Sequence, residues 1–225
     1  MVEKELLFSP KKKVIIAQEI VEDIKRAIIK RKIKPGEKIN ETKIAKAMGV
    51  SRSPVRDALQ QLRKEGIVVN IPYKGTFVSM MGIKDIEDMY ELRALLEAYS
   101  LEKIIDCKNN EKLIKKLKLI VYEIENAIKN KNFKKLSEKD VEFHREICKF
   151  TSNNKLIEIW EGFQSQFQIL IDLEASFYER LKLLAEEHEE ILNLIINKRL
   201  VEAQKKTKEH ILQALEFLKK SMLTK

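Results

Sequence analysis

Proline and glycine, the residues that most often interrupt helices, are confined almost entirely to the first third of this 225-residue chain. Residues 1–82 contain all four prolines and five of the six glycines, so Gly162 stands alone in the remaining 143 residues. A stretch of that length with no proline and a single glycine favours continuous helices. The sequence therefore predicts a mainly α protein, with an irregular N-terminal module followed by an all-α C-terminal module.

The net charge divides at the same place. Residues 1–80 contain 18 Lys and Arg against 9 Asp and Glu, whereas residues 81–225 contain 26 of each, so the N-terminal part carries the whole net charge of +9. A positive field limited to one module indicates a polyanionic partner such as DNA, although charge alone fits a solvated lysine-rich surface equally well. We expect a DNA-binding domain over 1–78, including a basic N-terminal tail, a linker over 79–84 and a helical domain over 85–225.

The two cysteines and the hydropathy pattern indicate the compartment. Cys107 and Cys148 form no CxxC motif, and the start MVEKELLFSPKKK lacks the apolar core of a signal peptide. No apolar run reaches the about 18 residues of a membrane span. We expect a cytoplasmic protein without a membrane partner.

Residues 14–79 have the pattern of three helices followed by a hairpin. Apolar residues recur at helical spacing over 14–33 and 41–48, and the third helix occupies SRSPVRDALQQLRKEG, where Ser51 or Ser53 could cap it, Pro54 fits the first turn and Gly66 closes it. The segments IVVNI and TFVS then read as strands joined by a PYKG turn. This order of elements predicts a winged helix-turn-helix.

The third helix has two distinct faces. Val55, Ala58, Leu59 and Leu62 follow the spacing of a packed face, while the opposite side carries Arg52, Arg56, Gln60 and Arg63. A helix of this kind fits the major groove, where arginine pairs with guanine. The alternative is a solvated face with Arg56 paired to a nearby acid.

The run INETKIAKAMGVSRSPVRDALQQLRKEGIVVNIPYKGTFV closely resembles the DNA-binding domain of GntR-family bacterial transcription regulators. The resemblance implies double-stranded operator DNA as the partner. It also implies that Arg52 and Arg56 contact the bases and the backbone of the DNA, and that Thr42 and Ser53 contact phosphates. Lys74 and Gly75 would form the wing tip, which also contacts DNA.

The C-terminal module is expected to contain six helices near 84–106, 111–130, 133–150, 154–173, 177–197 and 199–221, a bundle pattern. All three histidines of the chain, His144, His188 and His210, fall on apolar stripes, and Asp140 stands one turn before the first of them. A divalent cation would satisfy three buried imidazoles together with one carboxylate. The alternatives are hydrogen-bonded core histidines and, for Asp140, a capping-box acid paired with Ser137.

The segments RALLE, DVEFHREI, TSNNKLIEIW, EEHEEIL and KEHIL resemble the FCD effector domain of the fatty-acid-regulator branch of the GntR family. Its metal-binding members use an Asp and three His, which implies a site formed by Asp140, His144, His188 and His210. The expected number of six helices, rather than seven, resembles that of the vanillate-regulator-like subgroup. The resemblance also implies that Arg93 meets an effector carboxylate, although an ion pair with Glu97 is the alternative. Asn154 either caps a helix or contacts the effector.

These features predict a ligand-responsive transcription regulator, a repressor that binds operator DNA as a homodimer. Its effector is expected to be a small organic acid bound at one divalent metal per chain, with zinc favoured and nickel or manganese as alternatives. A purely structural metal is a second interpretation. A metallo-hydrolase fused to a DNA-binding module is a third, but the chain has no HExxH motif, and four protein ligands exceed the usual number at a catalytic zinc. We therefore expect no enzyme activity.

Overall fold

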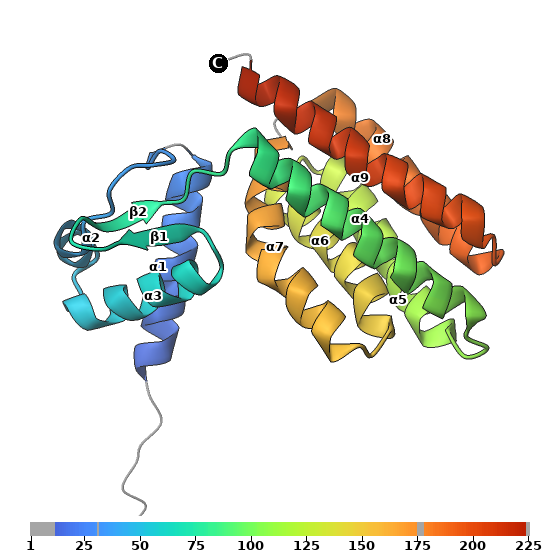
Figure 1. Ribbon diagram of the computed structural model, residues 1–225, viewed down its shortest axis with the longest axis horizontal. Coiled ribbons are helices and arrows are strands. Elements are labelled where there is room, and N and C mark those ends of the chain that lie inside the picture. Colours follow the sequence, from blue (N-terminus) through green and yellow to red (C-terminus); the bar gives the residue numbers. More distant parts are fainter. Residues whose placement is uncertain (1–11, 31, 175–177, 224–225) are drawn as a thin grey trace, which may run out of the picture. The chain divides into compact units, whose positions relative to one another are not determined.

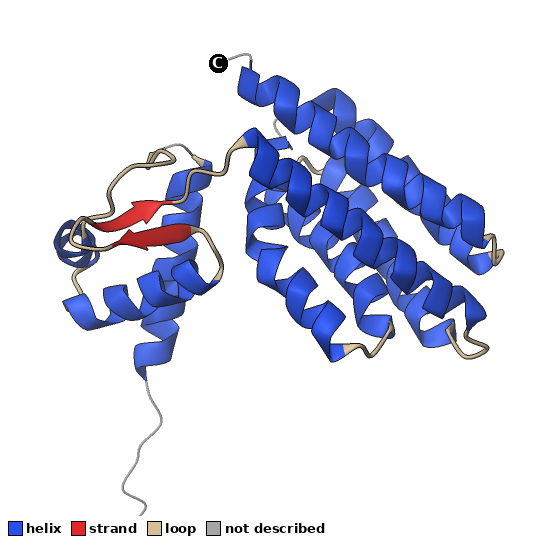
Figure 2. Cartoon of the chain, viewed as in Figure 1, coloured by secondary structure: helices blue, strands red, loops and turns tan. Residues whose placement is uncertain are grey.

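The computed structural model describes residues 12–30, 32–174 and 178–223. The chain divides into two compact units between Met80 and Met81 (Figure 1). Helices dominate both units, and the only strands among the described residues form one hairpin in the N-terminal unit (Figure 2). The mainly α fold class is confirmed. Within the described ranges, no helix combines the length and the apolarity that a membrane crossing needs.

The N-terminal unit consists of α1 (Lys12–Ile29), α2 (Glu41–Met48), α3 (Arg52–Lys64), β1 (Val68–Ile71) and β2 (Gly75–Val78). The apolar faces of α1 and α3 pack together, and this core includes Ile20, Val21, Ile24, Val55, Ala58 and Leu62. The apolar spacing therefore predicted the packed face of α3 correctly. The first helix ends at Ile29, before the predicted limit of residue 33.

Local turn chemistry fixes the ends of α2. Asn40 Oδ1 accepts a hydrogen bond from Lys43 N at 3.0 Å and so caps the first turn. Gly49 ends the helix in the left-handed region, with a φ of 66° that a residue without a Cβ adopts readily. The short turn that follows leads into α3, whose N-cap residue is Ser51. These three segments form the helix-turn-helix.

The wing is an antiparallel hairpin in which Val68 pairs with Val78 and Ile71 pairs with Gly75. Val68 and Val78 are buried against the helices, whereas the turn residues Pro72, Tyr73 and Lys74 are exposed. The hairpin therefore has buried side chains at one end and an exposed turn at the other.

The C-terminal unit has six helices in the described residues: α4 (Ile83–Asp106), α5 (Glu111–Lys129), α6 (Phe133–Phe150), α7 (Asn154–Glu174), α8 (Tyr178–Ile196) and α9 (Leu200–Leu223). These bounds lie close to the predicted ones. The helix α4 lies along α9, α5 packs on α6, and α6 packs on α7 (Figure 1). The predicted bundle is thus present.

Two clusters of buried apolar side chains fill the bundle, and α6 contributes to both. Phe143 and Ile147 join residues of α5 and α8 in one cluster. Val141 and Cys148 join residues of α4, α7 and α9 in the other. The side chains of α6 between these two faces, among them Asp140 and His144, are buried as well.

Two predicted capping roles were wrong. The helix α6 begins four residues before Ser137, and its cap is Asn132, whose Oδ1 accepts a hydrogen bond from Lys135 N. Ser137 is instead buried inside the helix, where its hydroxyl accepts a hydrogen bond from Gln168 Nε2. At α7 the capping side chain is Asn153, which accepts from the first backbone amides of that helix, rather than Asn154. In both helices, an asparagine one or more residues earlier reaches the free amides first.

Candidate metal centre and DNA-binding surface

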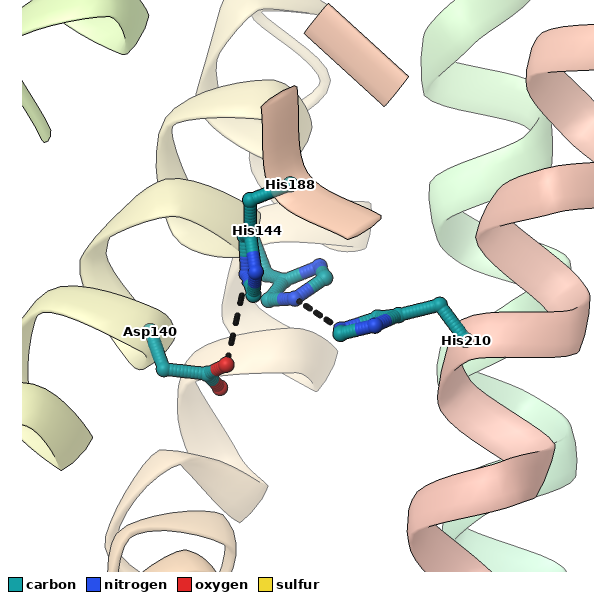
Figure 3. Close-up of side chains that lie close together, drawn as sticks. All are labelled: Asp140, His144, His188 and His210. Atoms are coloured by element: carbon teal, nitrogen blue, oxygen red, sulfur yellow. Dashed lines mark hydrogen bonds and ion pairs between the residues drawn. The ribbon is translucent and has the colours of Figure 1, made fainter. Parts of the chain in front are cut away.

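Four side chains from three helices meet inside the bundle. Asp140 and His144 come from α6, His188 from α8 and His210 from α9, and one ligand atom from each lies within 4.8 Å of all the others. Figure 3 shows the carboxylate and the three imidazole rings turned toward one another. All four residues are 3% exposed or less. The expectation that the histidines face the core is therefore confirmed.

Each imidazole is anchored through its Nδ1 atom. The acceptors are Glu97 Oε2 at 2.5 Å for His144, the main-chain oxygen of Leu184 at 2.7 Å for His188, and Glu187 Oε2 at 2.7 Å for His210. A carbonyl or an ionised carboxylate accepts but does not donate, so each Nδ1 must carry the proton. A neutral ring with a protonated Nδ1 has its lone pair on Nε2. The three anchors therefore leave the Nε2 atom of each ring as the one that can bind a cation.

These Nε2 atoms converge. His144 Nε2 and His210 Nε2 are 3.2 Å apart, and His188 Nε2 is 3.3 Å from Asp140 Oδ1. Within the described part of the chain, His188 Nε2 is buried without a hydrogen-bond partner. Two nitrogens bound to one tetrahedral zinc at about 2.0–2.1 Å would be about 3.3 Å apart. The spacing of the Nε2 atoms of His144 and His210 therefore fits two ligands of one shared cation.

A proton shared between two rings is the alternative explanation of the short nitrogen contact. That arrangement would require one ring to carry a second proton and a positive charge. Burial lowers the pKa of His210 to about 3 and also lowers the pKa of His144, despite the carboxylate beside each ring. Neutral rings are therefore the stable form of His144 and His210 at neutral pH, and their Nε2 atoms face each other in the buried interior.

Glu97 also belongs to the site, although the sequence indicated it only as an ion-pair partner of Arg93. This fully buried carboxylate on α4 accepts hydrogen bonds from Arg93 Nε at 2.8 Å and Trp160 Nε1 at 3.3 Å, in addition to His144. Burial opposes its ionisation, but the His144 and Arg93 donors outweigh burial and lower the pKa of Glu97 to about 2. Glu97 therefore holds the His144 ring while joining three helices.

Arg93 lies next to the cluster, in agreement with its predicted inward position. The residue is 3% exposed, and its guanidinium lies 5.0 Å from the centre of the Phe167 ring. The i+4 ion pair with Glu97 is present, and Arg93 Nη2 is 3.9 Å from Asp140 Oδ2. Asn154 is exposed at the first position of α7.

The predicted DNA-binding residues are displayed on the N-terminal unit. Arg52, Ser53 and Arg56 are exposed on α3, opposite the face that packs on α1. Arg56 Nε donates to Glu41 Oε2 at 2.9 Å, so the predicted alternative of a nearby acid is also realised. That bond uses Nε alone, and the Arg56 side chain remains 60% exposed. Its two terminal nitrogens are therefore available as a fork for a base or a phosphate.

The other three predicted DNA contacts lie around this helix. Thr42 is exposed near the start of α2, and Lys74 is exposed at the wing tip. Gly75 has a φ of 107°, a backbone conformation in which a side chain would be strained.

Comparison with known families decides the identity of both units. A model of the gntR family of bacterial regulatory proteins matches residues 16–78, and a model of the FCD domain matches residues 88–213. The chain belongs to the GntR family. It is a DNA-binding transcriptional regulator of the FCD-containing type, and its relatives are regulators rather than enzymes. The predicted family and the prediction of no enzyme activity are confirmed.

Two curated relatives from Bacillus subtilis (strain 168) align with most of this GntR regulator. The uncharacterized HTH-type transcriptional regulator YdhC is 29% identical over 87% of this chain and 88% of its own length. The gluconate operon transcriptional repressor is 29% identical over 93% of this chain and 84% of its own length. Both alignments span the two units.

Solved structures share the fold. The E. coli protein McbR/YncC aligns with a TM-score of 0.74 and 17% identity, covering 92% of this chain and 98% of its own. The metal-free FCD domain of TM0439 aligns with a TM-score of 0.53 and 23% identity, covering 65% of this chain and all of its own. The vanillate-regulator-like subgroup stays a prediction.

Proposed function

We propose that this GntR regulator is a repressor that binds operator DNA as a homodimer and responds to a small organic acid at a metal site in its FCD domain. The observation that carries the proposal is the set of three imidazoles that are anchored through Nδ1 and that converge with Asp140 inside the bundle. A cation stabilises three buried imidazole nitrogens and a carboxylate that converge on one point.

The charges around the cluster support a divalent ion. Asp140 belongs to the cluster itself, and the carboxylates of Glu97 and Glu187 hold two of its imidazole rings. The Arg93 guanidinium lies beside Glu97 and Asp140. Three nitrogen donors and one oxygen favour zinc, with nickel or manganese as alternatives. When bound, the metal would supply an electrophilic position for a ligand oxygen.

Arg93 supports a carboxylate as the effector. Its Nη2 atom lies 3.9 Å from Asp140 Oδ2, so a ligand carboxylate beside Asp140 would be within reach of the guanidinium. Large buried rings, including those of Phe143, Trp160 and Phe167, occupy the surrounding space. This packing favours a small acid over a long acyl chain. Asn154, which is exposed, is a weaker candidate for contact with the effector.

A purely structural metal is the second candidate function, and the burial of the site favours it. Asp140, His144, His188 and His210 are all 3% exposed or less, as in a closed structural site. In that case the metal would brace α6, α8 and α9 without meeting any effector.

An effector can alter operator affinity only if the effector itself binds the DNA-competent and the DNA-incompetent states of the regulator with different affinities. A coupling of about 1–3 kcal/mol would change operator affinity about 5- to 150-fold.

Calorimetry with hydroxy, keto and dicarboxylic acids tests the effector proposal. The titrations use zinc-loaded protein, metal-free protein, the Arg93→Ala variant and Arg145→Ala, a control at a partly exposed ion pair with Glu161. We expect one or more acids to bind zinc-loaded protein and the control variant, and to bind metal-free protein and Arg93→Ala much more weakly. Zinc binding without a response to any acid would favour the structural metal instead.

A further inference from the structure

One acid of the N-terminal unit is bound to the exposed face of α3. Glu41 is the first residue of α2, and its Oε2 atom accepts a hydrogen bond at 2.9 Å from Nε of Arg56, which lies 15 positions later in the chain. Among the described residues, the other two arginines that α3 exposes, Arg52 and Arg63, form no ion pair. Glu41 therefore acts on one of the three arginines that this helix presents.

The exposure of this ion pair argues against a mainly structural role. The side chain of Arg56 is 60% exposed and that of Glu41 is 31% exposed. An ion pair that is open to water contributes little to folding stability, because solvent screens the attraction. The helix α2 also has other anchors, namely the cap formed by Asn40 and the buried side chain of Ala45. The pair is therefore not what holds α2 in place.

A carboxylate at this place opposes the binding of DNA in general. Glu41 precedes Thr42 and contacts Arg56, and both of these residues are predicted to contact DNA. The affinity of a protein for DNA rises with the positive charge that it brings to the phosphates, so a negative charge on the same surface lowers it for every sequence. A gain from Glu41 in DNA binding is therefore expected in the discrimination between sequences.

The geometry of the bond leaves one end of the guanidinium free. Glu41 occupies Nε of Arg56, and the two terminal nitrogens form the fork that matches O6 and N7 of guanine. An arginine without such an anchor can turn toward a phosphate, a contact that adds affinity but carries no sequence information. The negative charge of Glu41 repels a phosphate that approaches the same guanidinium. The ion pair therefore favours a base contact by Arg56 over a phosphate contact.

We propose that Glu41 is a positioning residue that holds Arg56 toward the base edges and away from the phosphates. It thereby raises the sequence discrimination of the regulator while it lowers the affinity for DNA in general. The proposal rests on the proposed reading of DNA by α3. It adds to that reading a residue of α2 that acts on the DNA only through Arg56.

The test uses full-length protein and two duplexes, one that the unchanged protein enriches from a random-sequence library and one with the same bases in scrambled order. Fluorescence anisotropy measures both dissociation constants for the unchanged protein, Glu41→Ala, Arg56→Ala and the variant that combines the two. The matched control is Glu19→Ala, because Glu19 is an exposed acid of α1 that forms no ion pair with any described residue. Thermal melting of each variant reports its stability.

We expect Glu41→Ala to bind the scrambled duplex more tightly than the unchanged protein does. The ratio of the two dissociation constants should fall about 5- to 150-fold, the range of one bidentate base contact. Arg56→Ala should lower the ratio within the same range. Removal of Glu41 from Arg56→Ala should lower it no further, because Glu41 acts through Arg56. Glu19→Ala should leave the ratio unchanged.

An unchanged ratio for Glu41→Ala beside a lowered ratio for Arg56→Ala would overturn the proposal and leave Glu41 a structural role. An equal fall of the ratio when Arg56 is already absent would overturn it as well. An unchanged ratio for Arg56→Ala would show that this arginine reads no base, and the proposal would then fail together with the role of Arg56. The two failures are thus distinguishable.

Discussion

His144 Nδ1 lies 2.5 Å from Glu97 Oε2, although the two residues are 47 positions apart and belong to different helices. The same carboxylate accepts hydrogen bonds from Arg93 and Trp160. This contact fixes which nitrogen of His144 is free for a metal. Glu97 thereby connects the proposed metal site to the arginine proposed to hold the effector.

Replacement of Glu97 should weaken metal binding without unfolding the chain. Glu97→Gln retains an oxygen acceptor but removes the negative charge that orients and polarises His144, and changes of this kind typically reduce metal affinity about 10- to 100-fold. Competition with a chromophoric chelator measures the affinity. Circular dichroism checks the helix content.

The control for this experiment is Glu161→Gln, which removes a carboxylate from a partly exposed ion pair with Arg145 on α7 and α6. Its metal affinity should match that of the unchanged protein. Equal affinities for Glu97→Gln and Glu161→Gln would show that Glu97 does not support the site.

The recognition helix provides a second prediction. Arg52→Ala and Arg56→Ala should each cost on the order of 1–3 kcal/mol of operator binding if the side chain reads a base. Gel-shift titration at fixed salt measures the loss, with Arg145→Ala as a control in the C-terminal unit. An operator affinity that is unchanged by both substitutions would show that α3 does not recognise the operator sequence.

The two cysteines should differ in reactivity. Cys148 is 1% exposed, and burial raises the pKa of its thiol, which keeps it in the unreactive protonated form. Cys107 is half-buried in the connection after α4. Iodoacetamide at pH 8 should therefore modify one thiol per folded chain, and mass spectrometry should locate it at Cys107. Modification of Cys148 at the same rate in the folded protein would contradict the packing of α6.

Bound metal should stabilise the C-terminal unit. A ligand present at about 100 times its dissociation constant adds about 2.7 kcal/mol to the free energy of unfolding, provided that it does not bind the unfolded chain. Chelator treatment should lower the thermal midpoint by several degrees, and zinc should restore it. The His188→Ala variant should show no response to zinc, and a variant that responded as strongly as the unchanged protein would place the metal elsewhere.

Local patterns predicted most of the fold because they depend on neighbouring residues. The spacing of Val55, Ala58 and Leu62 gave the packed side of α3, and the loss of glycine and proline after residue 82 gave the bundle. The inward placement of three histidines followed from the same periodicity. The exact caps did not follow, because Asn132 and Ser137 both suit a helix start and only the chain path selects between them.

The partners of the histidines depend on tertiary packing. The sequence showed Glu97 as an i+4 partner of Arg93, but its bond to His144 arises only when α4 meets α6. Glu187 is adjacent to His188 in the sequence, yet it anchors His210 from another helix. A buried acid at helical spacing from an inward arginine was the available signal for Glu97. No local pattern distinguished Glu187 from the acids around it.

The metal content of the purified protein tests the central claim most directly. The protein is dialysed against a chelator, reloaded with zinc and separated from excess metal. Its zinc content is then measured by elemental mass spectrometry, together with that of the His188→Ala and Asp140→Ala variants prepared in the same way. We expect one zinc per unchanged chain and a strongly reduced content in both variants, since His188 Nε2 and Asp140 Oδ1 face each other at 3.3 Å in the site. Unchanged protein that retains no metal, or variants that retain as much as the unchanged protein, would contradict the account.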